Sequence, residues 1–307
     1  MDLESVVKKI REMRIRGALD IAIASASAMN SVVEKSAKTT PELISNLRKA
    51  GKKLKSARPS AVSLPNSVNY ILYLADKKRD LRVDEFRREL SSEISDFIKE
   101  QKNALNKISE IGSRLIDSGD VILTHCNSDT VNGILKRVWK KRKKIHVICT
   151  ETRPMYQGHI TARELSSYGI PVTMIIDSAV HHIMKELKVD KVMVGADTVC
   201  VNGDLINKIG TSQIAVCAKE QDIEFIVAAE SIKFSPLSIT GKIVEIEKRD
   251  PKEIIDPKKL KGVKILNPVF DITNSEYIDM IVTEFGVIPP QASYNLLKEK
   301  FGWGVQA

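Results

Sequence analysis

Hydrophobic residues recur at helical spacing through the first third of the chain, and no convincing alternating strand interrupts them. The pattern predicts helices over 3–14 and from Ala18 onward, and a third that has Thr40 as its N-cap and Pro41 at its first helical position. A long amphipathic helix is predicted over 84–117, with its apolar residues directed into a core. This part of the chain is therefore expected to be helical.

From Asp120 the pattern changes to short apolar runs that alternate with helical stretches. Repeated strand–helix units with buried strands are typical of an open, mostly parallel sheet with helices on both faces. We therefore predict an α/β protein: an N-terminal helical domain (1–118), then a Rossmann-like, doubly wound α/β catalytic domain (119–307). The predicted strands are 121–123, 145–149, 172–176, 192–194 and 225–228, and helices are expected at 161–168, 179–187 and 214–221. The proline-containing tail is expected to wrap over another surface, a dimer contact being one possibility.

Charge and composition narrow the class of protein. The 48 basic and 39 acidic side chains leave a formal charge of +9, which suits anionic partners from phosphorylated metabolites to nucleic acid. The densest basic run, Lys140 to Lys144, is expected to be a solvated helix end and turn, and only Trp139 is near it for base stacking, so nucleic-acid binding is not favoured. With no signal peptide and no apolar stretch of membrane-spanning length, a cytoplasmic protein is predicted.

Two residues at predicted strand ends carry the clearest chemistry. Cys126 follows the strand that ends at His125, and Asp197 follows Val194 through the small residues Gly195 and Ala196. The carboxyl ends of parallel strands meet at the edge where ligands bind, so the two can form an acid/base pair. A helix beginning near Ser128 would lower the pKa of the Cys126 thiol, and a dry pocket would let Asp197 hold a proton.

Each of these residues also has a plainer interpretation. Cys126 taken alone could be buried packing, Asp197 could cap a helix or turn, and His125 could be a packing histidine at a strand end. The four cysteines show no spacing typical of zinc, and the adjacent His181 and His182 are expected to point in different directions rather than bind a metal.

Polar side chains also cluster in five segments that are too apolar or too rich in Gly and Pro to be ordinary surface. Arginine offers a planar fork to phosphate oxygens, lysine a point charge, and glycine close approach of the backbone. Because several of the segments follow predicted strands, together they indicate a site for a small polyanion. The segments are Arg16–Ala18, Arg58–Ala61, Glu151–Gly158, Asn207–Thr211 and Glu230–Lys233.

These segments carry a resemblance that extends over nearly the whole chain. The sequence resembles the archaeal ribose-1,5-bisphosphate isomerase family, within the larger group of methylthioribose-1-phosphate isomerase and the regulatory α, β and δ subunits of translation initiation factor 2B. The motifs are Met13-Arg-Ile-Arg-Gly-Ala18, Ala57-Arg-Pro-Ser-Ala-Val-Ser-Leu-Pro-Asn66, Thr124-His-Cys-Asn-Ser128, Glu151-Thr-Arg-Pro154 with Gln157-Gly158, Gly195-Ala-Asp197, Ile206-Asn-Lys-Ile-Gly-Thr211, Ala229-Glu-Ser-Ile-Lys-Phe234, Val244-Glu-Ile-Glu-Lys-Arg-Asp250 and Asn267-Pro-Val-Phe-Asp271.

The resemblance implies an aldose–ketose isomerase that uses no metal and no cofactor. Asp197 would donate a proton to the ring oxygen, and the Cys126 thiolate would take the C2 proton, through a cis-phosphoenolate. The chain departs from the family pattern at Asp129, where the bisphosphate isomerases lead us to expect a lysine. A carboxylate beside a phosphate is repulsive, so either Asp129 is directed outward or the phosphate is bound differently. The residues implied to bind substrate are Arg16, Gly17, Ala18, Leu19, Arg58, Ser128, Asp129, Thr130, Gln157, Asn207, Lys208 and Lys233.

The same resemblance leaves two other functions open. One is a regulatory subunit that docks initiation factor 2, although the translation-factor subunits generally lack the equivalents of Cys126 and Asp197. The other is an isomerase of a different sugar 1-phosphate, such as methylthioribose 1-phosphate, which Asp129 keeps open. The family further implies a homo-oligomer, either a dimer or a trimer of dimers, activation by AMP, and a place in AMP and nucleoside degradation.

Overall fold

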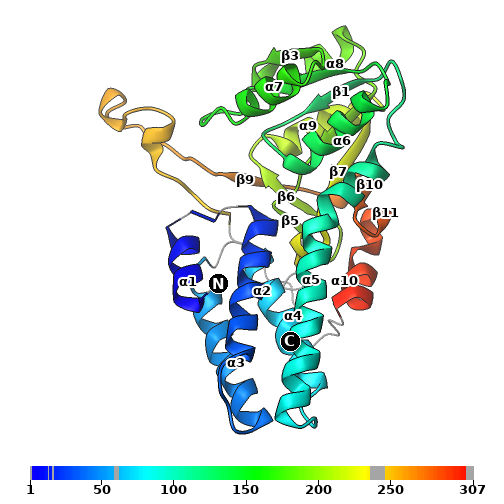
Figure 1. Cartoon of the computed structure of the whole chain (residues 1–307). Coiled ribbons are helices and arrows are strands. Elements are labelled where there is room, and N and C mark those ends of the chain that lie inside the picture. Colours follow the sequence, from blue (N-terminus) through cyan, green and yellow to red (C-terminus); the bar gives the residue numbers. More distant parts are fainter. Residues whose placement is uncertain (1, 13, 16, 59–61, 236–245, 302–307) are drawn as a thin grey trace. The chain divides into compact units, whose positions relative to one another are not determined.

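The computed structural model describes residues 2–12, 14–15, 17–58, 62–235 and 246–301. Arg16 lies outside these residues. The described chain divides into two compact units (Figure 1). Unit 1 comprises the chain up to Ala104, the short segment Ile232–Ser235 and the chain from Lys298; unit 2 comprises Leu105–Ser231 and 246–297. The domain boundary expected near residue 118 stays a prediction.

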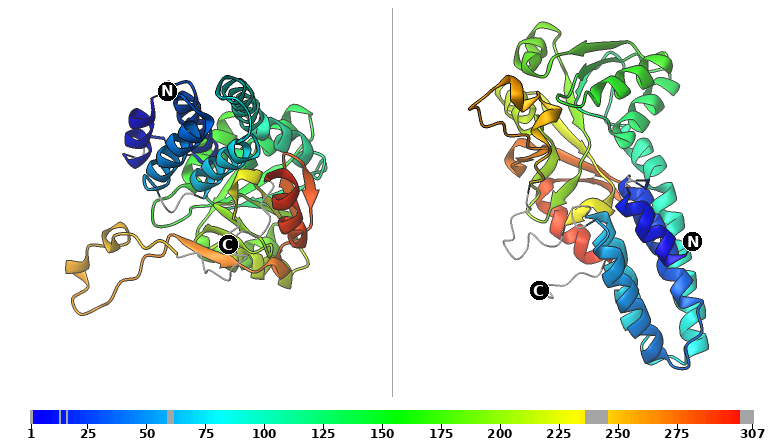
Figure 2. Two further views of the ribbon diagram at one scale, coloured as in Figure 1. Left: turned by 90° about the horizontal axis from the view of Figure 1, so that it is seen from below. Right: turned by 90° about the vertical axis from the view of Figure 1, so that its left-hand side faces the viewer.

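Unit 1 is built from helices that pack side by side (Figure 2). They are α1 (Leu3–Arg11), α2 (Ala18–Val33), α3 (Thr40–Lys55), α4 (Ser63–Lys77) and the first part of α5 (Val83–Gly112). Helix α2 contacts both α3 and α4, and residues such as Met29, Leu47 and Ile71 are fully buried among them. The predicted helical character is therefore confirmed.

The start of α3 differs from the expectation by one residue. Thr39, not Thr40, is the N-cap, and its hydroxyl accepts a hydrogen bond from the Glu42 amide at 3.3 Å. The Thr40 hydroxyl instead donates to the Leu81 carbonyl at 2.7 Å. Two adjacent threonines fit a cap equally well in sequence, and the contact with Leu81 decides between them.

Unit 2 is centred on a seven-stranded sheet with the order β11-β10-β7-β4-β1-β2-β3. All the neighbours are parallel except β11, which pairs antiparallel with β10. The chain runs outward from β1 to β3 and then returns to β4 on the other side of β1, so the topological switch point lies between β1 and β4. The strands are β1 (Val121–Thr124), β2 (His146–Thr150), β3 (Val172–Ile175), β4 (Lys191–Val194), β7 (Glu224–Ala228), β10 (Met280–Thr283) and β11 (Gly286–Ile288).

Helices flank this sheet in two pairs: α6 (Asp129–Lys140) packs on α7 (Gly158–Ser167), and α8 (Val180–Glu186) on α9 (Thr211–Glu220). The connections with α6 and α7 run along the sheet from β1 toward β3, and those with α8 and α9 run the other way, from β3 to β4 and on to β7. Right-handed crossovers in opposite directions place the two pairs of helices on opposite faces. The core between α6 and the sheet contains Ile122, Val147, Leu135 and Val138, all fully buried. The predicted doubly wound α/β fold is confirmed.

A second, antiparallel sheet was not expected from the sequence. In unit 2 it comprises β5 (Thr198–Cys200), β6 (Leu205–Lys208) and β9 (Phe270–Thr273). Its first strand, β5, begins directly after Asp197, so this sheet sets the direction of the chain after β4. The remaining short elements are β8 (Phe234–Ser235), η1 (Asp177–Ala179), η2 (Ser231–Lys233), η4 (Pro251–Glu253), η5 (Pro257–Lys259), η6 (Ser275–Tyr277), η7 (Pro290–Ala292) and α10 (Ser293–Phe301).

The proline-containing tail forms an extension of unit 2, drawn in orange in Figure 1. Residues 246–269, called the arm below, have only two short 3-10 turns, and a bridge between Lys248 and Pro268 joins their two ends. Four large apolar side chains of the arm are exposed: Ile254, Leu260, Val263 and Leu266. Among the described residues, no helix has both the length and the apolar character that a membrane crossing requires.

Candidate functional site

The two proposed catalytic residues lie at the two strand ends that border the switch point. Cys126 follows β1, and Asp197 follows β4, which is the neighbour of β1 in the sheet. Gly195 is required for Ser128 to pack against the end of β4, because a Cβ at position 195 would lie 2.5 Å from the Ser128 Oγ atom. The small residues between β4 and Asp197 thus let the start of α6 pack directly against the end of β4, as their size suggested.

The backbone at Cys126 is in a conformation that is unusual for its residue type. Cys126 has φ +67°, and Thr152, which follows β2, has φ +62°. A left-handed conformation costs a non-glycine residue on the order of 1–3 kcal/mol, and it is most unfavourable for a β-branched one. The Cys126 amide donates to the Thr152 hydroxyl at 2.9 Å, and the Thr152 amide donates to the Asp177 carboxylate at 2.8 Å. Two strained strand ends therefore stabilise each other, as is found at functional sites.

His125 lies directly before Cys126 and is almost fully buried. Its Nδ1 is 2.6 Å from the Thr150 hydroxyl, and its Nε2 is 2.9 Å from the Ile209 carbonyl oxygen. The ring thus joins the ends of β1 and β2 to the turn that follows β6. Burial lowers the pKa of His125, so the neutral imidazole is favoured.

The start of α6 uses its hydroxyl groups within the protein. Ser128 is the N-cap, and its Oγ accepts a hydrogen bond from the Val131 amide at 3.3 Å. Thr130 is buried and donates to the Glu230 carboxylate at 3.0 Å, whereas Asp129 is exposed. An exposed aspartate in the first turn interacts favourably with the helix dipole. Contact between these three residues and substrate stays a prediction.

The pKa of the Cys126 thiol is shifted in the opposite direction from the one expected. Burial raises the pKa of Cys126 to about 11, and the negative charges of Asp197 and Asp177 act in the same direction. The ammonium group of Lys208 and the amide of Asn127 lower the pKa, but by less than burial raises it. The expectation that the start of the helix gives a low pKa was wrong, because loss of solvation at the sulfur outweighs the favourable dipoles.

Asp197 occupies a different environment from Cys126. Its side chain is exposed, and its backbone amide donates to the Ile206 carbonyl at 3.0 Å, which ties it to β6. Its charge acts on the Cys126 sulfur, which places the two groups within electrostatic range of each other. The described residues leave this carboxylate exposed rather than in the dry pocket in which the sequence would let it hold a proton.

Lys208, at the end of β6, provides the positive charge near this pair. It is partly buried, and its ammonium group lies 5.1 Å from the centre of the Phe270 ring. Lys208 also lines a small cavity, open to solvent, together with Gln157, Arg249 and other residues of the β2–α7 connection and of the arm. The neighbouring Asn207 is buried, and its amide donates to the Thr211 hydroxyl at 3.0 Å. The sequence-predicted residues Gln157 and Lys208 therefore border one cavity.

The remaining predicted binding residues belong to unit 1. Gly17 is the N-cap of α2, and Ala18 and Leu19 are its first two residues. Arg58 follows α3, and Lys233 ends η2; both are partly buried. That these residues share a site with Cys126 stays a prediction.

Several residues that organise the site were not singled out from sequence. Thr150 and Thr152 lie at the end of β2, and Asp177 accepts hydrogen bonds from two consecutive amides, those of Thr152 and Arg153. Asp271 on β9 accepts hydrogen bonds from the Gly210 amide at 2.7 Å and from the Ser212 hydroxyl at 2.9 Å. Thr152 and Asp271 lie within quoted motifs, which was the available signal, whereas nothing in the sequence pointed to Asp177.

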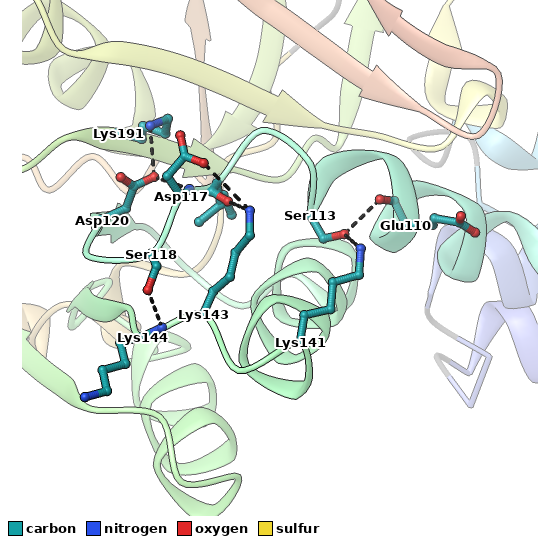
Figure 3. Close-up of polar contacts among 10 residues, drawn as sticks. Glu110, Ser113, Asp117, Ser118, Asp120, Lys141, Lys143, Lys144 and Lys191 are labelled. Carbon is teal, nitrogen blue, oxygen red and sulfur yellow. Dashed lines mark hydrogen bonds and ion pairs between the residues drawn. The ribbon is translucent and has the colours of Figure 1, made fainter.

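The basic run at the end of α6 contributes to folding rather than to this site (Figure 3). Lys141 donates to the Ser113 hydroxyl at 3.0 Å, and the Lys144 amide donates to the Ser118 hydroxyl at 3.1 Å. Lys143 bonds to the Ile116 carbonyl and lies near Asp117. These contacts agree with the interpretation of the run as a helix end and turn.

The chain is similar to known proteins over nearly its whole length. A ribose 1,5-bisphosphate isomerase from Pyrococcus furiosus is 46% identical over 97% of this chain and 94% of its own length. The crystal structure of translation initiation factor eIF-2B from Pyrococcus horikoshii OT3 has a TM-score of 0.74 at 32% identity, covering 94% of this chain and 97% of that one. For 5-methylthioribose 1-phosphate isomerase from the same organism, the TM-score is 0.75 at 32% identity, with coverages of 98% and 88%.

The family model described as the initiation factor 2 subunit family matches residues 14–290. This match includes both strand ends at the switch point, the Lys208 turn and the whole arm. The chain belongs to the initiation factor 2 subunit family.

Proposed function

We propose that this protein is a ribose-1,5-bisphosphate isomerase that converts α-D-ribose 1,5-bisphosphate to D-ribulose 1,5-bisphosphate. The observation that carries the proposal is the pairing of Cys126 and Asp197 at the switch point, with Lys208 near the sulfur. A full-length relative with that name supports the substrate. A docking subunit would need neither the strained thiol nor the carboxylate, so their presence favours the enzyme.

The reaction requires one acid and one base to act in each step on two atoms that are bonded to the same carbon: the ring oxygen and C2 on either side of C1, then the 2-hydroxyl oxygen and C1 on either side of C2. Asp197 gives a proton to the ring oxygen as the bond between that oxygen and C1 breaks, and the Cys126 thiolate takes the C2 proton. The resulting enol phosphate loses the proton of its 2-hydroxyl to Asp197 and receives the proton from Cys126 at C1. Atoms and charges balance, and both groups return to their starting forms. Such steps typically contribute about 100- to 10,000-fold each.

The electrostatics of the site imply that the pair holds one proton. In the protein without substrate this proton resides on sulfur, because burial and the charge of Asp197 both disfavour the thiolate. Moving the proton to Asp197 leaves the total charge unchanged and gives the reactive form. A substrate that covers the exposed Asp197 side chain removes water from it, which favours its neutral acid, while Lys208 stabilises the thiolate.

The test is turnover in D2O. The protein is incubated with ribose 1,5-bisphosphate, and product formation and deuterium at C1 and C2 are followed by NMR. We expect ribulose 1,5-bisphosphate whose C1 carries either the hydrogen taken from C2, where Cys126 returns it directly, or deuterium, where the thiol first exchanges with solvent. We expect no product from Cys126→Ser, with unchanged circular dichroism. Cys217→Ser, which changes a partly buried cysteine on α9, is the matched control and should react like the wild type. Absence of turnover by the wild-type protein contradicts the proposal.

A different sugar 1-phosphate is the second candidate, because Asp129 places a carboxylate at the start of α6. Its exposure is compatible with a side chain directed away from a bound phosphate. Competition between ribose 1,5-bisphosphate and methylthioribose 1-phosphate in one reaction separates the two candidates. Preference for the bisphosphate, strengthened in Asp129→Lys, supports the first; preference for the methylthio sugar supports the second.

Assembly and regulation complete the proposal. We propose that the exposed apolar side chains of the arm contact a second copy of the chain, in a dimer or a trimer of dimers. Leu266→Glu should then lower the mass measured by light scattering, whereas an unchanged mass contradicts this contact. Activation by AMP is tested by adding AMP to the same turnover assay.

A further inference from the structure

His125 has a role in the structure that the acid/base pair does not account for. Its side chain is 2% exposed and makes one hydrogen bond to β2 and one to the turn after β6. A histidine that only filled space would not need partners on both nitrogens. The question is what these two hydrogen bonds hold in place.

The identity of the partners fixes the tautomer. The Ile209 carbonyl oxygen can only accept, so the Nε2 atom at 2.9 Å must carry the hydrogen. In the neutral ring Nδ1 is then an acceptor, and the Thr150 hydroxyl donates to it at 2.6 Å. Burial favours this neutral form, and the charged groups that act on the ring are Asp177 and Lys208.

Ile209 lies between Lys208 and Gly210, so its carbonyl is part of the turn that carries Lys208. This turn, Lys208–Gly210, is held on its other side by the end of the arm and by β9: the Ile209 amide donates to the Val269 carbonyl at 2.9 Å, and the Gly210 amide to Asp271 at 2.7 Å. Gly210 has φ +103°, and a Cβ there would lie 3.2 Å from two ring atoms of His125. The ring therefore packs against the turn as well as bonding to it.

We propose that His125 is a positioning residue, whose Nε2–H holds the Lys208–Gly210 turn and so keeps the Lys208 ammonium group within electrostatic range of the Cys126 sulfur. This inference deepens the proposed function and rests on it for the turnover measurement. The reactivity of Cys126 can be measured without substrate. The inference can therefore fail or hold separately from the choice of sugar phosphate.

A matched pair of substitutions separates the two hydrogen bonds of the ring. Glutamine extends an N–H donor to about the position of Nε2 and can reach Ile209, whereas asparagine reaches only the position of Nδ1 and Thr150. We expect His125→Asn to slow alkylation of Cys126 by iodoacetamide about tenfold between pH 7 and pH 9, which corresponds to a rise of about one unit in the thiol pKa. His125→Gln should lose less than about threefold on the same scale.

Peptide mass spectrometry assigns the alkylation to Cys126 and uses Cys217 in the same sample as an internal reference. Lys208→Met should slow the alkylation of Cys126 as much as His125→Asn does. The double variant should react no more slowly than either single variant, because both changes remove the same interaction. In the turnover assay, these variants should lower kcat by a larger factor than they change KM. If asparagine and glutamine act alike, or Cys126 reactivity is unchanged in both, the proposal is overturned.

A second route remains if His125→Asn does not fold. Gly210→Ala crowds the same ring from the turn and strains a residue with positive φ. It should likewise slow alkylation of Cys126, with Cys217 unaffected. An unchanged rate in this variant, with melting measured by circular dichroism to show that it is folded, overturns the proposal as well.

Discussion

The ends of β1 and β4 border the same switch point, yet they are built in different ways. At the end of β1, Cys126 has a left-handed backbone, a thiol whose pKa is raised by burial, and an amide bonded to the equally strained Thr152. At the end of β4, Gly195 and Ala196 lead into an exposed Asp197. One end is fixed and desolvated, and the other is open to solvent. The proposed acid/base pair fits this asymmetry, because burial favours the neutral thiol of Cys126 and the exposed carboxylate of Asp197 is open to a ligand.

The largest expected effect comes from breaking the pair. Cys126→Ala and Asp197→Asn should each lower kcat/KM for ribose 1,5-bisphosphate by about 100- to 10,000-fold. Because the two groups exchange one proton, the double variant should be little slower than the worse single one. Steady-state kinetics on all three variants measures this. Losses that multiply in the double variant would mean that the two residues act independently.

The next comparison concerns the strained end itself. Thr152→Val keeps the β-branched shape at φ +62° but removes the hydroxyl that accepts from the Cys126 amide. The buried amide loses its partner, which should lower the free energy of unfolding by about 1–3 kcal/mol and reduce turnover as Cys126 shifts. Thr152→Ser keeps the acceptor and is the matched control. Urea unfolding and kinetics on both variants test the role of this bond; equal behaviour of Val and Ser argues against it.

Much of this architecture could be predicted from sequence, and the limits are specific. Apolar runs at strand length predicted the strands of the seven-stranded sheet through β7, and the motifs led to the family, which is confirmed. The antiparallel strands β5, β6 and β9 were missed, because β5 and β6 are only three and four residues long and β9 is far along the chain from its partner β6. The direction of the pKa shift at Cys126 was wrong, because the sequence shows a nearby helix start but not how much protein surrounds the sulfur.

Some side-chain partners at the site could not be read from the sequence. The predicted contact of Thr130 with substrate stays a prediction, and its hydroxyl donates to Glu230, which lies 100 residues away along the chain. Asn207 donates to Thr211, within its own turn. Local spacing identifies which residue types gather at a strand end, whereas the choice of partner depends on the packing of distant segments. The left-handed φ of Cys126 and Thr152 has no sequence signature at all, since neither is a glycine.

A smaller effect tests how closely the two strand ends pack. Gly195→Ala places a methyl group 2.5 Å from the Ser128 Oγ atom and 2.8 Å from its Cβ atom. Overpacking of this kind typically costs about 1–3 kcal/mol. Ser128→Gly removes both contacts and costs only a few tenths of a kcal/mol as an N-cap, so the double variant should recover most of the loss. Thermal melting of the four proteins measures the coupling, and additive losses would show that the two sites do not touch.

The smallest expected effect is a change of stability with pH. It concerns a strand end away from the switch point, where a carboxylate is buried instead of exposed. Glu284 follows β10, is 8% exposed and accepts from the amide of Ser231 at 3.0 Å and from its hydroxyl at 2.5 Å. Burial raises the pKa of Glu284, and the charge of Glu230 adds to the rise, although the bonds from Ser231 oppose it.

A carboxyl group whose pKa is higher in the folded than in the unfolded protein binds protons more tightly when folded. Its contribution to stability is therefore complete below the unfolded pKa of about 4.3 and is lost as the pH rises through the folded value. Glu284→Gln cannot titrate, so the stability of the wild type relative to this variant should decrease between pH 4.5 and pH 7.5, as measured by melting temperature at both values. Asp129→Asn, at an exposed position of the same unit, is the control for general charge effects. A difference that stays constant or grows with pH would mean that Ser231 stabilises the carboxylate more than burial destabilises it.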